Sequence, residues 1–196
     1  MWIILGDEYM LKKPLSFVQE LLKDSVMEND IIIDATVGNG NDTLLLATLV
    51  GPTGKVYGFD VQEEAIQTTK TKLLLTGLLP QTELILDGHE NLDQYVPENP
   101  NISAITFNLG YLPKSDKSII TTADTTLKAI EKSLIRLRKG GLITIMVYYG
   151  HEGGLEEKTG VANFVANLPQ EEYQVLKYEF VNQKNNPPFL FVIEKK

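Results

Sequence analysis

Runs of strand-forming residues alternate with helical segments along most of this chain, and this alternation limits the fold more than any other feature. Short apolar runs rich in Ile and Val occur at residues 31–34, 55–60, 83–86, 102–107 and 141–148. Segments with helical patterns lie at residues 15–27, 42–50, 62–76, 121–138 and 154–167. Strands that alternate with helices predict a parallel sheet whose two faces are both covered by helices.

The last part of the sequence departs from this alternation. Residues 173–181 and 189–194 have the pattern of two strands, and the segment NQKNNPP between them leaves no room for a helix. Two strands with a short connection pair antiparallel. The sequence therefore predicts a seven-stranded, mostly parallel α/β sheet with a C-terminal antiparallel hairpin and helices on both faces. This Rossmann-like architecture resembles that of class I methyltransferases, although a fold alone does not fix a function.

Length and composition set broad limits. The 196 residues suffice for one sizeable core, so residues 1–196 are predicted to form a single domain, with residues 1–9 as an appendage if Met10 is the functional start. The absence of cysteine excludes disulfides and thiolate chemistry. No apolar run reaches the ~18 residues of a membrane span, and the N-terminus lacks the features of a signal peptide. The expected compartment is the cytoplasm, and no metal site is predicted.

A loop with two glycines follows the first predicted strand, in the segment IIIDATVGNGND. A dinucleotide-binding G-x-G-x-x-G pattern would need a glycine where Thr43 stands, and no Gly-Lys-Ser/Thr follows to form a Walker loop. Asp34 would repel a pyrophosphate, but it suits a ligand with an ammonium and a sulfonium group, such as S-adenosylmethionine. The alternative is a tight turn, and in either case Asp42 can be the N-cap of the next helix. The predicted cofactor-binding residues of this segment are Asp34, Thr36, Gly38, Asn39, Gly40, Asn41 and Asp42.

The next two strand ends carry further acids. Asp60 can accept hydrogen bonds from both ribose hydroxyls of an adenosine, which fits NAD as well as S-adenosylmethionine, and Val61 is assigned to the same site. Asp87 can accept from the adenine amino group, with Gly88 leaving space for the ring, although a plain Asp-Gly turn is the alternative. His89 belongs to this cofactor-binding segment, where a structural role is favoured over a role as a base.

The fourth predicted strand ends in the segment FNLGYLP. Methyltransferases that alkylate amino nitrogens carry Asn/Asp-Pro-Pro-Tyr/Phe at this place. Here Asn108 and Tyr111 match the two ends of that motif, and Leu109 and Gly110 replace the prolines. The Asn108 amide oxygen can accept from the target nitrogen beside the methyl donor, and the Tyr111 ring can stack on the base. The alternative is a structural turn with a buried tyrosine.

Four segments together carry a family resemblance: DATVGNGNDTLLLA, GFDVQEEAI, FNLGYLPKSDKSIITTADTTLKAI and YYGHEGG. The chain resembles, from about Leu11 to Lys196, the small bacterial methyltransferases labelled rRNA methylases. These include the MnmM-type enzymes, which methylate the aminomethyl group on the wobble uridine of certain tRNAs to give 5-methylaminomethyl-2-thiouridine. The chain departs from the general methyltransferase pattern D-x-G-x-G-x-G at its first glycine, where Thr36 stands. The resemblance implies the cofactor S-adenosylmethionine and a tRNA anticodon stem-loop as substrate.

Methylation of a primary amine requires alignment of the reactants and one proton acceptor. Asn108 can orient the amine but cannot act as a base. His151 has a pKa range that suits the task, but a loop histidine hydrogen-bonded to backbone is an equal alternative. Asp116 is a second candidate base, which can instead cap the following helix. Two further alternatives are a non-catalytic adenosine-ligand binding protein and an NAD-dependent oxidoreductase.

The charge distribution suggests where RNA would bind. The net charge is −8, yet residues 111–150 carry 7 basic and 3 acidic side chains. Lys114 and Lys117 follow the predicted amine site and are, with Gly110, assigned to the substrate RNA. Three basic residues spaced four apart form a stripe on one predicted helix: Lys128, Lys132 and Arg136. Arg138 and Lys139 extend this positive charge to the end of the helix. A solvated helix face explains the stripe equally well. Recognition is expected to come from the catalytic domain or from a homodimer.

Overall fold

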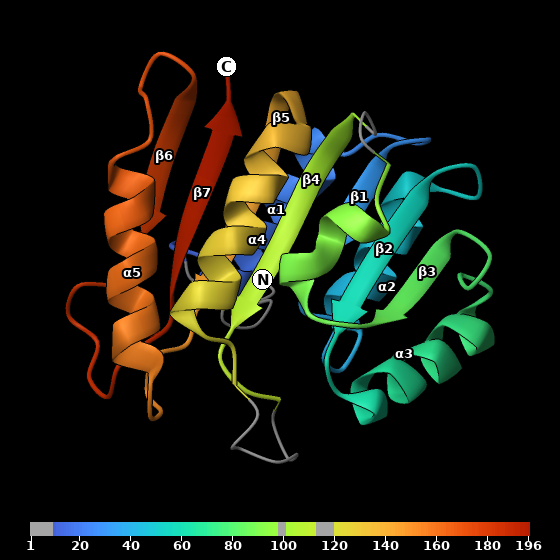
Figure 1. Cartoon of the computed structure of the whole chain (residues 1–196), viewed down its shortest axis with the longest axis horizontal. Helices are drawn as coiled ribbons and strands as arrows, with labels where there is room; N and C mark the ends of the chain where they lie inside the picture. The colour runs from blue at the N-terminus through green and yellow to red at the C-terminus, as the bar shows by residue number, and fades with distance from the viewer. Residues whose placement is uncertain (1–9, 98–100, 113–119) are drawn as a thin grey trace, which may run out of the picture.

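A computed structural model describes residues 10–97, 101–112 and 120–196 of the chain, and their strands join into one sheet (Figure 1). The order of the strands across the sheet is β3-β2-β1-β4-β5-β7-β6. The strands are β1 (Ile31–Asp34), β2 (Lys55–Asp60), β3 (Thr82–Leu86), β4 (Ile102–Leu109), β5 (Leu137–Val147), β6 (Tyr173–Tyr178) and β7 (Phe189–Lys195).

Strands β1 to β5 pair parallel to one another, whereas β7 pairs antiparallel to both β5 and β6. The predicted fold class is therefore confirmed: the sheet is mostly parallel and finishes in an antiparallel hairpin. Strand β7 lies inside the sheet, because it is inserted between β5 and β6.

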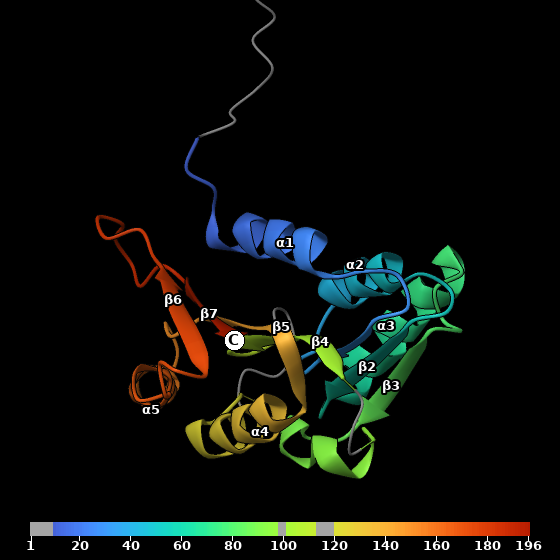
Figure 2. The ribbon, with the colours of Figure 1, turned by 90° about the horizontal axis from the view of Figure 1, so that it is seen from above.

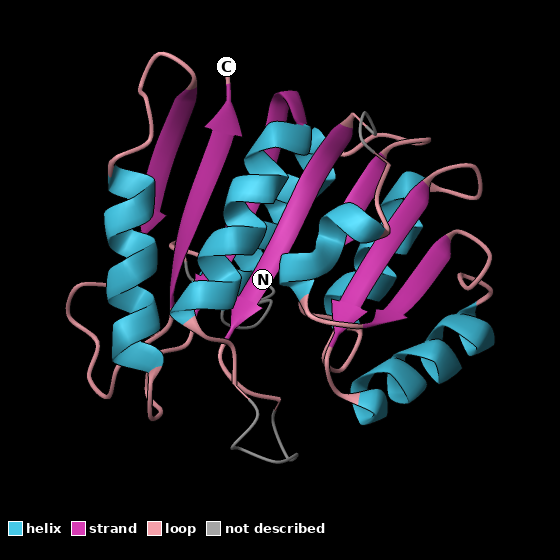
Figure 3. Cartoon of the chain, in the orientation of Figure 1, coloured by secondary structure: helices cyan, strands magenta, loops and turns pink. Residues whose placement is uncertain are grey.

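Helices cover both faces of the sheet, as Figures 2 and 3 show. The helices α1, α2 and α3 pack on one face around Leu22, Leu46 and Leu73. The helices α4 and α5 and the 3-10 helix η1 pack on the other face around Leu92 and Ile130. Their bounds are α1 (Pro14–Ser25), α2 (Asn41–Val50), α3 (Glu63–Thr76), η1 (His89–Gln94), α4 (Ala123–Arg136) and α5 (Gly154–Ala166).

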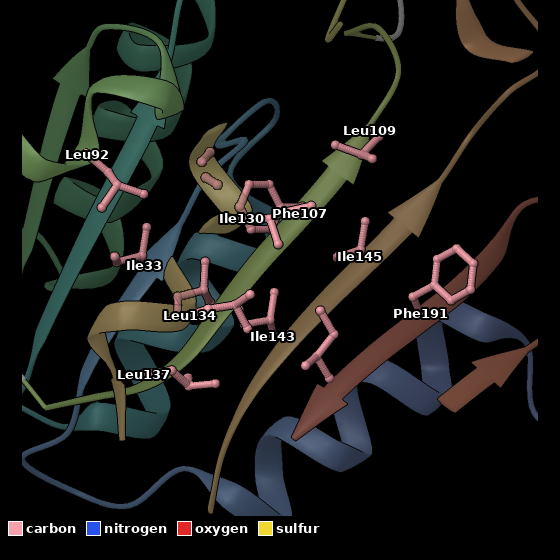
Figure 4. Packing of buried hydrophobic residues seen from close by; sticks show 14 of the residues in the cluster. Ile33, Leu92, Phe107, Leu109, Ile130, Leu134, Leu137, Ile143, Ile145 and Phe191 are labelled. Carbon is pink, nitrogen blue, oxygen red and sulfur yellow. The ribbon is translucent and has the colours of Figure 1, made fainter. Parts of the chain in front are cut away.

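The central strands are buried on both faces. Ile33, Phe107 and Ile143 on three neighbouring strands are at most 1% exposed, and they pack against side chains of η1 and α4 (Figure 4). Burial of such a side chain contributes about 1.5–3 kcal/mol relative to an exposed one. The continuous Ile and Val runs of the sequence thus reflect strands that have no solvent-facing side.

Both boundaries of one predicted helix are wrong, and the helix expected over residues 15–27 ends at Ser25. The helix expected over residues 121–138 begins at Ala123, after Thr122 accepts a hydrogen bond from the Thr125 amide, and it ends at Arg136. Leu137 and Arg138 already belong to β5, so Arg138 and Lys139 do not extend a helical stripe. The change has a physical reason, because Leu137 is buried in the core and the Arg138 guanidinium pairs with both carboxylate oxygens of Asp30 at 3.1 and 3.2 Å.

Candidate active site

The strand order reverses between β1 and β4, and ligands of open α/β sheets bind at the carboxyl ends of the strands at such a point. Asp34 ends β1 and is the register partner of Thr106 on β4. Asp60 ends β2, and Asn108 lies next to the last residue of β4. The fold therefore brings these predicted residues to one edge of the sheet, the lower edge in Figure 1.

Asp34 lies beneath the glycine loop, and its side chain does not reach the surface of the protein. Its side chain is 0% exposed, and its carboxylate accepts hydrogen bonds from the Thr43 hydroxyl at 2.6 Å and the Thr36 amide at 3.2 Å. Burial, reinforced by the charge of Asp42, raises the pKa of Asp34 to about 7. Direct contact of Asp34 with a ligand stays a prediction, and in this structure the side chain acts on the site through its charge and its hydrogen bonds.

Asp42 is not an N-cap. Helix α2 begins at Asn41 after Gly40, and no side chain caps it. The Asp42 carboxylate instead accepts a hydrogen bond from the side-chain amide nitrogen of Asn108, at 2.8 Å. The N-cap prediction was therefore wrong, because the helix begins one residue before Asp42, with Gly40 at the N-cap position. Burial raises the pKa of Asp42, and the hydrogen bond from Asn108 opposes this shift.

Thr36 stands where the general methyltransferase pattern has its first glycine, and the structure shows its role. Its hydroxyl accepts a hydrogen bond from the Asn108 backbone amide at 2.7 Å, and its own amide donates to Asp34. Thr36 therefore ties the glycine loop to the end of β4. A glycine at this position could not make the first of these bonds.

Helix α3 braces the glycine loop from the side. Gly40 has a φ of 76°, and a Cβ atom there would lie 2.4 Å from the Thr69 hydroxyl, so close packing against α3 requires glycine. Lys72 donates to the Asn39 carbonyl at 2.6 Å and reaches the Asn41 side chain at 3.5 Å. At Gly40, the missing side chain makes room for Thr69 of α3, and contact of Gly40 with the cofactor stays a prediction.

Asp60 links the loop to β2. Its carboxylate accepts hydrogen bonds from the Gly38 amide at 2.8 Å and the Gln62 amide at 2.9 Å. Burial raises the pKa of Asp60. A carboxylate has about four acceptor positions, so ribose hydroxyls can bind beside these two amides. The neighbouring Val61 is 59% exposed, and Leu86, the register partner of Asp60, is 54% exposed. These exposed apolar side chains suit the face of an adenine ring.

The segment after β3 is held by its own hydrogen bonds. Asp87 accepts from the Asn91 side chain, the Tyr95 hydroxyl and the Gly88 amide, and the bond from Asn91 contributes most to the lowered pKa of Asp87. A Cβ atom on Gly88 would meet the Glu90 carboxylate, so Glu90 occupies the space that the sequence assigned to the adenine ring. A role of Asp87 and Gly88 in adenine binding stays a prediction.

His89 has a structural position. It is 6% exposed, its Nδ1 lies 2.9 Å from the Ala35 carbonyl oxygen, and burial lowers the pKa of the imidazole. A neutral ring with the proton on Nδ1 donates to that carbonyl and supports the start of the glycine loop. This geometry agrees with the structural role that the sequence favoured.

The end of β4 continues into Gly110 and Tyr111. Gly110 has a φ of 150°, and a Cβ atom there would lie 3.2 Å from the Cβ of Tyr148. The Tyr111 ring is 39% exposed, so it is not the buried tyrosine of a structural turn, and it meets the His151 ring edge-to-face at 5.6 Å. Both ring nitrogens of His151 are buried and have no hydrogen-bond partner among the described residues. This contradicts the alternative of a loop histidine bonded to backbone, and its role as a base stays a prediction.

Sequence reasoning missed three residues that surround this turn. Thr121 accepts from the Gly110 amide at 2.9 Å and donates to Glu157 at 2.8 Å, so it links the turn to α5. Glu157 is 2% exposed and also accepts from Thr126 at 2.6 Å. Tyr148 follows β5 beside Gly110, and burial, with the charge of Asp42, raises its pKa. Extending the strand-end rule to the fifth strand would have found Tyr148, whereas no sequence signal marks Thr121 or Glu157.

Two of the three basic residues of the stripe on α4 form ion pairs within the chain. Lys128 pairs with Asp124 at 2.7 Å, Lys132 pairs with Asp93 at 2.7 Å, and Arg136 donates to the Lys132 carbonyl at 3.2 Å. These contacts favour the solvated-face interpretation over RNA binding. Lys114, Asp116 and Lys117 lie outside the described residues. Thr122 is the N-cap of α4, so this helix does not use Asp116 as its cap.

Comparisons with known proteins agree with this geometry. The chain is 35% identical, over 98% of its length and 73% of the relative, to the chloroplastic tRNA (mnm(5)s(2)U34)-methyltransferase of Arabidopsis thaliana. A crystal structure of a protein from Clostridium thermocellum described as a "putative rRNA-methylase" matches 96% of this chain and 100% of its own, with 44% identity and a TM-score of 0.93. A protein of Streptococcus mutans described as a "putative methyltransferase" and solved in complex with SAH (S-adenosylhomocysteine) matches 95% of this chain and 100% of its own, with 47% identity and a TM-score of 0.87.

The fold and the site thus define an S-adenosylmethionine-dependent class I methyltransferase. The residues present suit this cofactor, because Asp60 offers acceptors for ribose hydroxyls, and the buried carboxyl group of Asp34 and the partly buried ones of Asp42 and Asp60 favour a cation. Within this class, the chain belongs to the family described as "Putative rRNA methylase", whose pattern matches residues 56–194.

Two further findings concern the described residues. None of their helices is long and apolar enough to cross a membrane. They also contain no group of three His, Cys, Asp or Glu side chains that is arranged to hold a metal ion. The cytoplasmic compartment and the homodimer stay predictions.

Proposed function

We propose that this chain transfers a methyl group from S-adenosylmethionine to the aminomethyl group of the wobble uridine of tRNA, giving 5-methylaminomethyl-(2-thio)uridine. The observation that carries the proposal is the match to the Arabidopsis tRNA (mnm(5)s(2)U34)-methyltransferase, which extends over 98% of the chain. A shared fold alone would not identify a substrate. A match over this length includes the turn Asn108–Tyr111, where the acceptor would bind.

The chemistry of the site supports an amine acceptor. S-adenosylmethionine supplies an electrophilic methyl group, and an uncharged amine attacks it without a covalent enzyme intermediate. The enzyme must therefore hold the amine in line with the methyl carbon and receive one proton. Asn108 can do the first, because its side-chain nitrogen donates to Asp42, while no hydrogen bond from the described residues occupies its oxygen, which can accept an N–H of the substrate.

The charge of the site also favours this pair of reactants. Asp34, Asp42 and Asp60 each have a pKa raised by burial, so their negative charges are poorly compensated inside the chain. A sulfonium group and an amine that gains positive charge during the reaction would both be stabilised by these carboxylates. A phosphate or carboxylate acceptor would be repelled.

The tRNA anticodon stem-loop is the proposed partner. The wobble base lies in a single-stranded loop, so it can leave its stack and enter a protein pocket. Tyr111 follows Asn108 by three residues and is 39% exposed, which suits stacking on the base. The proton acceptor is proposed to be His151, whose ring meets Tyr111 at 5.6 Å.

Nucleoside mass spectrometry tests the proposed function. Total tRNA from a strain that lacks the protein should accumulate the 5-aminomethyl form and lose the 5-methylaminomethyl form. Purified protein with S-adenosylmethionine should then restore the methylated nucleoside in that tRNA. A normal nucleoside profile in the deletion strain, together with methylation of rRNA by the purified protein, would overturn the proposal in favour of the rRNA activity that the family description carries.

A further inference from the structure

Asn108 is held by two hydrogen bonds to residues that follow β1, one from its side-chain amide and one from its backbone amide. Its side-chain nitrogen donates to Asp42 at 2.8 Å, and its backbone amide donates to the Thr36 hydroxyl at 2.7 Å. Both contacts join β4 to the loop and helix that follow β1, about seventy residues earlier in the chain. The first contact fixes the side-chain rotation, and the second fixes the backbone from which the side chain extends.

The contact with Asp42 determines which way the amide faces. An ionised carboxylate accepts hydrogen bonds and cannot donate them, so the amide must turn its nitrogen toward Asp42. The Asn108 oxygen then faces the opposite direction, and among the described residues no hydrogen bond occupies it. Without Asp42, the amide could rotate by about half a turn and present donors where an amine substrate also presents donors.

The placement of Asp42 in its own helix supports this role. An aspartate in the first turn of a helix commonly interacts with the free backbone amides there. Asp42 is in the first turn of α2, but no side chain caps that helix, and the carboxylate extends across to β4. Asp42 thus makes the partly buried contact with Asn108, although the free backbone amides of its own helix were available as partners.

We propose that Asp42 is a positioning residue that acts through Asn108. Asp42 holds the side-chain amide of Asn108 so that the amide oxygen faces the amine nitrogen of the substrate. The oxygen can then accept an N–H of the amine, which directs the lone pair of the amine to the methyl carbon. This inference rests on the proposed amine substrate. It differs from two other roles for Asp42, direct contact with the cofactor and proton acceptance from the amine, since those roles would not depend on Asn108.

A double-mutant cycle separates these roles. Asp42→Ala should lower kcat for tRNA methylation by roughly 10- to 100-fold, because misplacement of a reactant by about an ångström costs about that much. The dissociation constant of S-adenosylmethionine, measured by calorimetry, should rise much less than kcat falls, because Asp42 is expected to act on the cofactor only through its charge and not by direct contact. In an Asn108→Ala background, Asp42→Ala should cost less than about twofold more, since the two residues act as one unit. A full additional loss in that background would overturn the proposal.

Conservative and control variants guard against effects on folding. Asp42→Asn keeps the size of the side chain and an acceptor oxygen, but its amide can also donate and therefore fixes the Asn108 amide less firmly, so it should lower kcat by less than Asp42→Ala does. Asp124→Ala is the matched control, because Asp124 is the second residue of α4 as Asp42 is the second residue of α2, but its carboxylate pairs with the exposed Lys128. This control should leave kcat and cofactor binding unchanged.

A measurement on the cofactor-free protein tests the contact without any substrate. In a nitrogen-15 correlation spectrum, the two Asn108 side-chain amide protons, identified by their loss in Asn108→Asp, should be well separated because one is bonded to a carboxylate. In Asp42→Ala, this separation should shrink to that of a solvated asparagine. An unchanged signal would overturn the inference. If the protein does not methylate aminomethyl-uridine tRNA, the proposed function fails, while the spectrum still decides whether Asp42 holds the amide.

Discussion

Replacement of the buried Asp34 by asparagine should stabilise the folded chain, and the gain should grow with pH. The pKa of Asp34 is raised from 3.8 to about 7, mainly by burial. An acid with a raised pKa in the folded state keeps its proton longer there than in the unfolded chain. The folded state therefore binds more protons between about pH 4 and pH 7, and this group makes the free energy of unfolding fall as pH rises through that range.

The magnitude follows from the size of the shift. Each unit of pKa difference corresponds to about 1.36 kcal/mol, so a shift from 3.8 to about 7 gives a ceiling of roughly 4 kcal/mol above pH 7. The free energy of unfolding changes between about pH 4 and pH 7, and two pH units of this range lie between pH 5 and pH 7. The stability difference between Asp34→Asn and the unmutated protein should therefore widen by about 2.5 kcal/mol from pH 5 to pH 8.

Urea unfolding of both proteins at several pH values measures this difference. The comparison is needed because other groups titrate too: burial raises the pKa of Asp42 and of Asp60, whose effects have the same sign, and lowers the pKa of His89, which has the opposite sign. These contributions largely cancel when the two proteins are subtracted. A stability difference that stays constant within about 0.5 kcal/mol from pH 5 to pH 8 would refute the reasoning about Asp34.

Three other predictions concern ligands. Asp60→Ala should weaken binding of S-adenosylmethionine tenfold or more in calorimetry, since hydrogen bonds to a charged group contribute ~1.5–3 kcal/mol each; an unchanged dissociation constant would contradict the ribose assignment. Tyr111→Ala should weaken binding of substrate tRNA by ~1–3 kcal/mol in a filter-binding assay if the ring stacks on a base, and equal affinity would exclude stacking. Lys114→Ala combined with Lys117→Ala should raise the tRNA dissociation constant and flatten its salt dependence, whereas Lys128→Ala should not; identical salt slopes in all three proteins would show that these two lysines do not bind phosphate.

The fold was predictable from the sequence because strands alternate with helices along most of the chain and the last two strands are joined by a short connection. The strands 31–34 and 55–60 begin and end as predicted, since Ile and Val runs bounded by turn residues leave few alternatives. The end of α4 was not predictable, because the apolar spacing continues through Leu137. A tertiary contact, the ion pair of Arg138 with Asp30, accompanies the change to a strand there. The 3-10 helix η1 has no periodic pattern and was also missed.

For the site, the sequence predicted only which residues lie near one another. Strand-end positions placed Asp34, Asp60 and Asn108 at one edge of the sheet. The sequence could not show that Asp34 is buried beneath the loop or that Asp42 binds Asn108 rather than its own helix, because both depend on how two distant segments pack. Hydroxyl partners such as Thr36 and Thr121 were equally hidden, since threonine is common in every kind of structure.

The insertion of β7 between β5 and β6 has a consequence for biosynthesis. Residues 142–147 of β5 pair with residues 189–194 of β7, and β6 pairs with β7. A ribosome that has made the chain as far as β6 has therefore made a sheet with an open edge at β5, where Ile143 and Ile145 would be fully buried in the finished protein. The nascent chain exposes the unpaired edge of β5 until nearly all of the 196 residues have left the exit tunnel. Chaperone demand during synthesis, and aggregation of chains that stop before Phe189, should accordingly be high relative to a fold whose strands are added in spatial order.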